Sequence, residues 1–392
     1  MGQRRLVIGD LRVQVLERSG GWRSYTIVGP DGAVFEDADR FLLTFEGSGT
    51  QRTYAYCLVD HLRWCAREGL GPDTVALRDL QRYMGAVGAQ VRGPFGQPWR
   101  ERPWGQSALQ TAASCVKGFY LHHAGYGVNP ELGAALNLSR LPSRADRRRS
   151  LLGHVSMSLP SNPLTPRAAV RRRHPKMLPD GARERLLAAV RTARDRLVVT
   201  WLADGGFRIG ELCGLHLGDL HLREDAGCGQ CRAPHVHVCH RPGNPNRAAA
   251  KTKLPWTVQD GTITGGLIKR VSPAMIHTYF EYMTEQRSGA EPAHPMLLIG
   301  LAGPGLGQPW APVAARGMLR RAGQRAGLGR VRPHAFRHSF ASAVLDASGG
   351  NLLIARDAGG WASAAVVDEI YGHVDLHDPA FDAALRATWE RP

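Results

Sequence analysis

The stretch Arg332-Pro-His-Ala-Phe-Arg-His-Ser-Phe-Ala-Ser342 places two arginines and two histidines at the start of a helix that we expect to run from Pro333 to Leu345. His334 and Arg337 stand three residues apart, so they share one face of that helix. Taken alone, this face has an ordinary structural explanation. Its meaning depends on the other polar side chains that the chain brings to it.

A second stretch, Gly206-Phe-Arg-Ile-Gly-Glu-Leu-Cys-Gly-Leu215, lies upstream. Gly205-Gly206 interrupts a helical region expected over 180–204, and Arg208 follows at the break. Glu211 comes three residues later, close enough along a helical turn to hold the guanidinium group of Arg208. A plain Arg/Glu pair at a helix start is the alternative interpretation.

Three more candidates are isolated in the chain. Lys251 lies in a predicted hairpin turn, between strands expected at His235–Cys239 and Trp256–Val258. Trp361 occurs in Gly-Gly-Trp, and Tyr371 occurs in Ile-Tyr-Gly. Each has an alternative structural role, as a solvated turn lysine, a core aromatic residue and a packing residue of an amphipathic helix.

The order Arg, Lys, His-x-x-Arg, Trp, Tyr along the chain resembles the tyrosine recombinase, or phage integrase, family. The stretch 206–215 resembles the first arginine motif of that family, and 332–342 closely resembles the second. Farther upstream, Thr50-x-x-Thr-Tyr-Ala-Tyr-x-Leu58 resembles the first helix of its core-binding domain. The resemblance implies a site-specific DNA recombinase or integrase, and it covers both the predicted helical module and the whole catalytic domain.

The resemblance also implies a role for each residue, in a reaction that needs no cofactor, metal or ATP. Tyr371 would attack the scissile DNA phosphate and form a 3′-phosphotyrosyl bond. Arg208 and Arg337 would bind the non-bridging oxygens, because guanidinium groups match phosphate bidentately. Lys251 would protonate the departing 5′ oxygen, and His334 would assist proton transfer or bond the phosphate.

Trp361 occupies the position that many relatives fill with histidine, where its indole N–H would contact the phosphate beneath the nucleophile. It stands one residue farther from Tyr371 than is usual among relatives. The chain therefore needs a bulge here, or Gly360 takes that position.

Two departures concern the lysine and the supporting histidines. Lys253 is a rival for Lys251, although the spacing to the strand that begins at Trp256 favours Lys251. Trp256 itself replaces an arginine that is usual in the family. We expect His338 and His373 to be supporting groups.

The expected fold is mainly α with a small β-sheet (α+β). Short alternating apolar stretches predict a β-rich N-terminal arm over residues 1–44. Helical periodicity over 45–140 predicts a DNA-binding module, for which the resemblance implies a SAM-like core-binding fold. A basic, Pro-rich linker is expected over 141–176. Mixed helix and strand signals over 177–392 predict the catalytic domain with its C-terminal tail.

The chain has 392 residues and a formal net charge of +16, which favours a polyanionic partner, most simply nucleic acid. The stretch from Arg140 to Lys176 holds ten Lys or Arg residues against one acid, Asp146. A solvated, flexible connector is one interpretation of this run. A basic strap between two domains that enclose duplex DNA is the other, because Lys and Arg neutralise phosphates without reading sequence.

Seven cysteines without a secretory signal favour a reduced, cytoplasmic protein with no disulfide framework. No membrane association is expected, since prolines interrupt the longest stretch free of charged residues, 293–315. Cys228-Gly-Gln-Cys231 makes zinc an alternative, with further potential ligands at His235, His237, Cys239 and His240. The second pair of this pattern lacks the usual spacing, so ordinary loop and strand residues are favoured and no metal site is predicted.

The partner implied by the resemblance is double-stranded DNA with inverted half-sites, bound by a dimer and, in synapsis, by a tetramer. The target sequence, the accessory proteins and the type of rearrangement stay open. Residues 378–389 predict a helical tail that caps its own domain or docks on a neighbouring subunit. The rival functions are DNA relaxation by a type IB topoisomerase and a catalytically weakened, DNA-binding accessory role.

Overall fold

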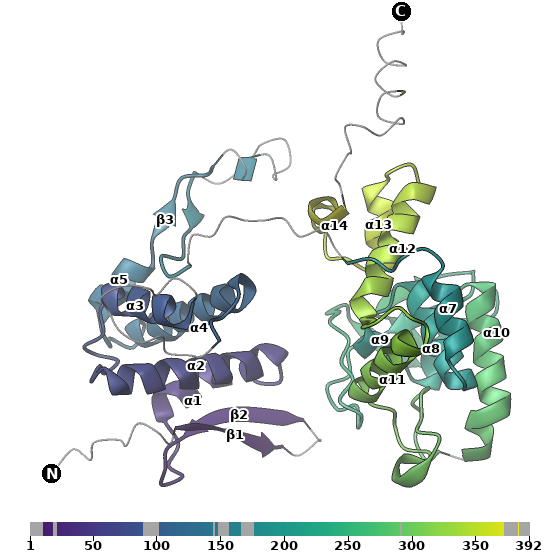
Figure 1. The fold of residues 1–392 in the computed structure, drawn as a ribbon, viewed down its shortest axis with the longest axis horizontal. Coiled ribbons are helices and arrows are strands. Elements are labelled where there is room, and N and C mark those ends of the chain that lie inside the picture. The colour runs from purple at the N-terminus through teal and green to yellow at the C-terminus, as the bar shows by residue number, and fades with distance from the viewer. Residues whose placement is uncertain are drawn as a thin grey trace, which may run out of the picture. The chain divides into compact units, whose positions relative to one another are not determined.

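The computed structural model describes residues 11–18, 22–88, 102–143, 146–147, 157–165, 176–290, 292–371 and 383. Contacts divide the chain into two compact units, Met1–Arg171 and Arg172–Pro392 (Figure 1). Each unit is described by itself. Much of the predicted basic linker lies outside the described residues, as do His373 and, apart from residue 383, the predicted C-terminal tail.

The N-terminal unit begins with an antiparallel hairpin and continues with helices. The hairpin consists of β1 (Arg12–Glu17) and β2 (Arg23–Val28). The helices are α1 (Glu36–Leu43), α2 (Gly49–Arg67), α3 (Leu77–Val87), α4 (Gln106–Ala124) and α5 (Pro130–Leu136). The short strands β3 (Ser139–Arg140) and β4 (Leu159–Pro160) pair with each other. Helix α2 begins at the predicted place because the Ser48 side chain accepts a hydrogen bond from the backbone N–H of Gln51.

One hydrophobic core joins the hairpin of this unit to its helices. Ile27 of β2 and Leu11, which directly precedes β1, are buried in the same cluster as residues of α1, α2 and α4. Phe41 of α1 packs edge to face against Phe119 of α4, with ring centroids 5.8 Å apart. The strands that the sequence suggests as an arm therefore share a core with the helical module.

The C-terminal unit combines helices with two small sheets. Its helices are α7 (Ala182–Ala189), α8 (Ala193–Gly205), α9 (Ile209–Cys213), α10 (Pro273–Tyr282), α11 (Pro312–Arg325), α12 (Pro333–Ala347), α13 (Leu352–Gly359) and α14 (Ala364–Tyr371). Its short helical turns are η2 (Leu217–Asp219), η3 (Met283–Arg287), η4 (Ser288–Ala290) and η5 (Gly303–Gly305). Antiparallel strands form a three-stranded sheet in the order β5 (Leu220–His221), β6 (His235–Val238) and β9 (Leu267–Arg270). A hairpin of β7 (Trp256–Gln259) and β8 (Thr262–Gly265) makes the second sheet.

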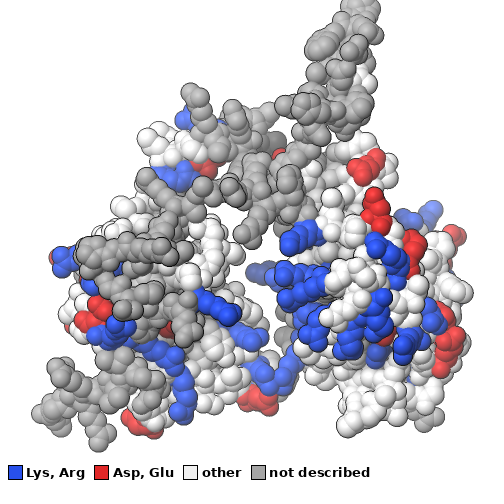
Figure 2. Space-filling view, in the orientation of Figure 1, with Lys and Arg blue, Asp and Glu red and all other residues white. Residues whose placement is uncertain are grey.

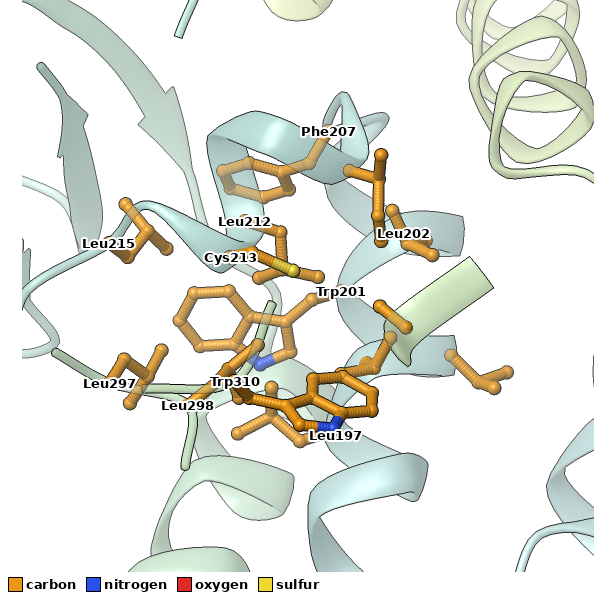
Figure 3. Packing of buried hydrophobic residues seen from close by; sticks show 14 of the residues in the cluster. Leu197, Trp201, Leu202, Phe207, Leu212, Cys213, Leu215, Leu297, Leu298 and Trp310 are labelled. Atoms are coloured by element: carbon orange, nitrogen blue, oxygen red, sulfur yellow. The ribbon is translucent and has the colours of Figure 1, made fainter. Parts of the chain in front are cut away.

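Trp201 lies at the centre of the C-terminal core. It is fully buried on α8, among apolar side chains that include Leu212 and Leu297 (Figure 3). Its indole N–H donates a hydrogen bond of 3.0 Å to the carbonyl of Met275, so the ring is buried with its polar atom satisfied. This core holds α8, α9 and α10 together and so supports the break at Gly205-Gly206.

The mainly α fold with small sheets is confirmed. Most predicted elements occur at the expected places, including the strands at β6 and β7 and the helix at α12. The predicted hairpin turn at Lys251 is wrong. Lys251 lies in the irregular connection 239–255 between β6 and β7, and the chain turns instead at Asp260-Gly261, where both residues have positive φ. Among the described residues, no helix is both long and apolar enough to span a bilayer.

Replacing Trp201 with alanine should leave a large cavity at the centre of the C-terminal core. We expect Trp201→Ala to lower the free energy of unfolding of this unit by about 3–5 kcal/mol, measured by urea unfolding of the full chain. Val313→Ala is the control, because Val313 is 72% exposed on α11. Equal unfolding midpoints for the two variants would contradict this account of the core.

Candidate active site

Arg208 is placed by the break between α8 and α9. Gly206 ends α8 in the left-handed region, with φ of 56°, and a Cβ atom there would clash with the ring of Phe340. Arg208 then caps α9, and its Nη1 donates a 2.6 Å hydrogen bond to Oε1 of Glu211. Glu211 is buried and also accepts a bond from the backbone N–H of Arg208. The predicted Arg/Glu contact is therefore present, and the Arg208 side chain keeps 27% of its exposure.

Arg337 of α12 is buried and fixed by backbone carbonyls. Its Nη1 donates to the carbonyls of Gly206, at 2.8 Å, and Gly359, at 2.7 Å. Its guanidinium carbon lies 4.0 Å from the ring centroid of Trp361, in a cation–π contact. Burial, together with the neighbouring charge of Arg208, lowers the pKa of Arg337 to about 10, so the group still carries its charge at neutral pH.

Lys269 on β9 is a second buried cation beside Arg337. Its Nζ donates to the carbonyls of Gly205, at 2.8 Å, and Ala358, at 3.0 Å. These carbonyls belong to the C-terminal ends of α8 and α13, where the helix dipole is negative and favours a cation. Sequence reasoning missed this lysine. In the sequence Lys269 appears as a charged residue in a short apolar stretch, and such a side chain normally keeps its charged end in solvent.

Tyr371 ends α14 with its hydroxyl group against a histidine. Its Oη lies 2.6 Å from Nδ1 of His338, and its ring meets Trp361 edge to face, with centroids 5.9 Å apart. Burial raises the pKa of Tyr371 to about 12, although the charge of Arg337 opposes this effect. The phenol is therefore protonated at neutral pH and needs a proton acceptor before it can act as a nucleophile.

His338 is the group placed to accept that proton. Burial, then the neighbouring His334 and Arg337, lowers its pKa below 6.5, so its imidazole is neutral at pH 7. A neutral imidazole can accept a hydrogen bond from the phenol. The sequence predicts that His334 assists proton transfer and that His338 is a supporting group. Helical spacing alone does not show which of the two histidines contacts Tyr371, because Tyr371 lies on a different helix, α14.

His334 and Lys251 complete the site. Burial lowers the pKa of His334, and the positive charges of Arg337, Arg208 and Lys251 lower it further, so all three cations lie near this imidazole. Lys251 is exposed, and the segment before it is held by a 2.7 Å hydrogen bond between Nδ1 of His240 and the carbonyl of Ala250. The same segment packs against α9, since a Cβ atom on Gly210 would lie 2.7 Å from the carbonyl oxygen of Ala249.

The six predicted residues therefore gather in one region of the C-terminal unit, although they come from separate elements. Trp361 lies two residues after the end of α13 and contacts both Arg337 and Tyr371. Lys and Arg side chains also cluster on the face of this unit that is visible in Figure 2. A tyrosine, a neutral imidazole acceptor and several cations can together carry out nucleophilic attack on a phosphodiester and stabilise its charge.

Lys269 should make the stability of this unit depend on pH. Burial lowers its pKa to about 7 in the folded chain, whereas a lysine in an unfolded chain has a pKa of about 10.4. Between these values the unfolded chain binds the additional proton. The free energy of unfolding therefore rises with pH, by up to about 1.4 kcal/mol per pH unit. A neutral amine keeps two N–H donors, so both carbonyl bonds persist.

The measurement is urea unfolding of the full chain between about pH 7 and about pH 8.5, below the range in which most thiols ionise. In Lys269→Met the free energy of unfolding should rise less with pH than it does in the unmodified chain. Lys253→Met, which changes an exposed lysine of the same unit, should leave the rise intact. Parallel pH profiles for Lys269→Met and the unmodified chain would show that the lysine stays protonated when buried.

Residues 268–377 match the family model described as the phage integrase family. Transposase A from transposon Tn554 of Staphylococcus aureus is 25% identical over 162 residues, which are 41% of this chain and 39% of that protein. The chain thus spans about two fifths of the length of the curated relatives it matches.

Among solved structures, the Tn1549 transposon integrase in complex with circular intermediate DNA matches 91% of this chain and 98% of that chain, with a TM-score of 0.57 and 16% identity. XerH site-specific recombinase bound to its difH substrate, in a post-cleavage complex, matches 87% of this chain and 80% of that chain, with a TM-score of 0.53 and 15% identity. Residues 268–377 thus match the phage integrase family model, and the chain shares its fold with these solved recombinases.

Proposed function

We propose that this protein is a site-specific DNA recombinase that cleaves and rejoins DNA through Tyr371. The observation that supports this proposal best is the 2.6 Å contact between Oη of Tyr371 and Nδ1 of His338. A phenol with a raised pKa is thereby paired with a neutral acceptor, next to the buried cation of Arg337. The match of residues 268–377 to the phage integrase family model agrees with this assignment.

In the first step Oη of Tyr371 forms a bond to the scissile phosphorus as the bond to the 5′ oxygen breaks. The phenolic proton passes to His338, and the departing 5′ oxygen takes a proton from Lys251. The product is a 3′-phosphotyrosyl bond and a free 5′ hydroxyl group. Attack by a 5′ hydroxyl group on this linkage reverses the step and releases the tyrosine, so the bond energy is kept and no ATP is needed.

The two arginines have different freedom to bind the phosphate. Arg208 is held by Glu211 through one nitrogen and is partly exposed, which leaves the rest of its fork for the non-bridging oxygens. Arg337 is held from behind by two carbonyls and by Trp361. Donors fixed in advance in this way stabilise the charge of the pentacoordinate transition state, and losing one such donor typically costs about 3–4 kcal/mol.

His334 and Trp361 would assist at the phosphate. Cations surround His334 and its imidazole is neutral, so it can donate one N–H to a phosphate oxygen. Trp361 packs between Arg337 and Tyr371, and we propose that its indole N–H also reaches the phosphate. Although Trp361 stands one residue farther from Tyr371 in the sequence than is usual among relatives, its ring still contacts the ring of Tyr371.

The substrate would be duplex DNA with inverted half-sites, each bound by one protomer, with a tetramer forming in synapsis. The positive charge of the chain supports a polyanionic substrate. The basic residues of 141–176 would add contacts to the DNA backbone, and binding would therefore be strongly salt-dependent. The Tn1549 integrase and XerH structures contain DNA, which favours the same partner here.

Tyr371→Phe should bind DNA normally but form no covalent adduct, because the nucleophilic oxygen is missing. The measurement is trapping of protein on a nicked suicide substrate that carries the DNA flanking the gene, read by denaturing gel electrophoresis. Tyr279→Phe is the control, since Tyr279 is a half-buried tyrosine on α10 of the same unit.

Undiminished adduct in Tyr371→Phe would refute the assignment of the nucleophile. An unmodified chain that binds the substrate without any adduct would support an accessory role instead. Relaxation of supercoiled plasmid without site preference would favour a topoisomerase.

Cleavage should also fall as the pH drops. His338 must be neutral to accept the phenolic proton, and its pKa lies below 6.5, so the rate should be level near neutrality and decrease as the pH falls through that lowered pKa. His338→Gln should cleave roughly 100-fold more slowly or worse at neutral pH. His277→Gln, an exposed histidine on α10, is the control. An unchanged rate in His338→Gln would exclude this imidazole as the acceptor.

A further inference from the structure

Four potential metal ligands gather at the small sheet of the C-terminal unit, separate from the proposed catalytic residues. They are His221 on β5, Cys228 in the connection 222–234, and His235 and His237 on β6. Each offers one ligand atom, and these atoms all lie within 4.8 Å of one another. Cys228, His235 and His237 are buried, and His221 is partly buried. The register of β5 and β6 explains part of this arrangement, because His221 and His235 are direct partners across the two strands.

Hydrogen bonds to backbone carbonyls settle the tautomers of two of these histidines. Nδ1 of His235 lies 2.7 Å from the carbonyl of Ala233, and Nδ1 of His237 lies 2.7 Å from the carbonyl of Gly265. A carbonyl oxygen can only accept, so both Nδ1 atoms carry the hydrogen. In each neutral ring the lone pair is then on Nε2. A carbonyl behind the ring is also the usual outer partner of a metal-binding histidine.

The two Nε2 atoms face each other at 3.1 Å. Two lone pairs at this distance repel each other unless a cation lies between or beside them. A shared proton is one such cation.

The other two groups point to a metal ion. Sγ of Cys228 lies 3.3 Å from Nε2 of His235. Nδ1 of His221 is buried and has no hydrogen-bond partner among the residues that the structure describes. A buried polar nitrogen without a partner is unfavourable unless something else occupies its lone pair or takes its proton.

We propose that His221, Cys228, His235 and His237 bind one zinc ion in a tetrahedral site. Zinc binds thiolate at about 2.3 Å and imidazole at about 2.0–2.1 Å, which places ligand atoms roughly 3.3–3.6 Å apart in a tetrahedron. The observed contacts of 3.1 and 3.3 Å are close to these values. Mixed sulfur and nitrogen ligands favour zinc over calcium or magnesium, which prefer oxygen.

This ligand set differs from the one that the sequence suggests. The sequence pairs Cys228 with Cys231, but Sγ of Cys231 lies 3.5 Å from the carbonyl of Ala233 and does not belong to the cluster. His221 lies before the cysteine pair, outside the pattern that the sequence suggests. Only strand pairing brings it to His235.

Four protein ligands leave no open position, so the ion would be structural. It would attach the connection 222–234 to the sheet and, through the His237 bond to Gly265, to the end of β8. The connection 239–255, which carries Lys251, leaves directly from the end of β6. The zinc ion would therefore hold the base of the segment that presents Lys251, and its binding does not depend on the proposed catalysis.

The test is metal binding by the full-length chain, purified through denaturation in chelator and refolded without metal. Titration with cobalt chloride should give one equivalent of bound cobalt, with the visible absorption of a tetrahedral ion and a thiolate-to-cobalt charge-transfer band. Added zinc should displace the cobalt. In chain purified without chelator, mass spectrometry should find one zinc per chain. A chain that takes up no cobalt, or gives an octahedral spectrum, would overturn the proposal and leave the shared proton as the explanation.

Variants identify the ligands. Cys228→Ser should abolish the charge-transfer band, and His237→Asn should weaken cobalt binding by more than the roughly 10–100-fold loss that follows removal of an outer partner. Cys231→Ser is the matched control, because this thiol lies three positions away and outside the cluster; it should keep the full spectrum. Loss of the band in Cys231→Ser, or its retention in Cys228→Ser, would refute this ligand set. The cobalt spectrum of the unmodified chain decides the matter even if Cys228→Ser does not fold.

Discussion

Two buried basic side chains hold the C-terminal unit together at the place where two helices end. Arg337 donates to the carbonyls of Gly206 and Gly359, and Lys269 donates to those of Gly205 and Ala358. Helix ends leave carbonyl groups without partners, and such groups are costly when buried. The N–H groups of both side chains satisfy these carbonyls, and the charge of Arg337 also complements the negative ends of the helix dipoles. Arg208 follows one of these ends in the chain and Trp361 follows the other, so both segments of the site depend on the same contacts.

This arrangement gives one arginine both a structural and a proposed chemical role. Arg337 is fixed by backbone atoms and by the ring of Trp361, which itself contacts Tyr371. A guanidinium group held in this way loses little further freedom when it binds a phosphate, and fixed donors stabilise developing charge most effectively. Burial costs the cation some of its solvation, which the lowered pKa of Arg337 reflects. The carbonyl oxygens offset part of that cost.

Much of the fold was predictable because local rules govern it. Helix α2 begins after Ser48, α8 ends at Gly206, and the contact between Arg208 and Glu211 lies within one helical turn. The contact between His338 and Tyr371 could not be predicted, because it joins two helices that only packing brings together. The irregular connection around Lys251 was also missed. Its course follows from packing against α9 and from the bond to His240, and neither leaves a local pattern in the sequence.

The sequence by itself determined the order of the helices and strands, the two motifs that resemble those of the phage integrase family and the excess of positive charge. These properties depend on residue type and on spacing over a few turns, which are visible in a linear chain. Only the tertiary structure decided which histidine meets Tyr371, which lysine is buried, and that His221 joins Cys228, His235 and His237. Such contacts depend on strand register and helix packing between distant residues. The register and the packing are determined by the burial of many side chains at once, so these contacts cannot be predicted from any short stretch of sequence.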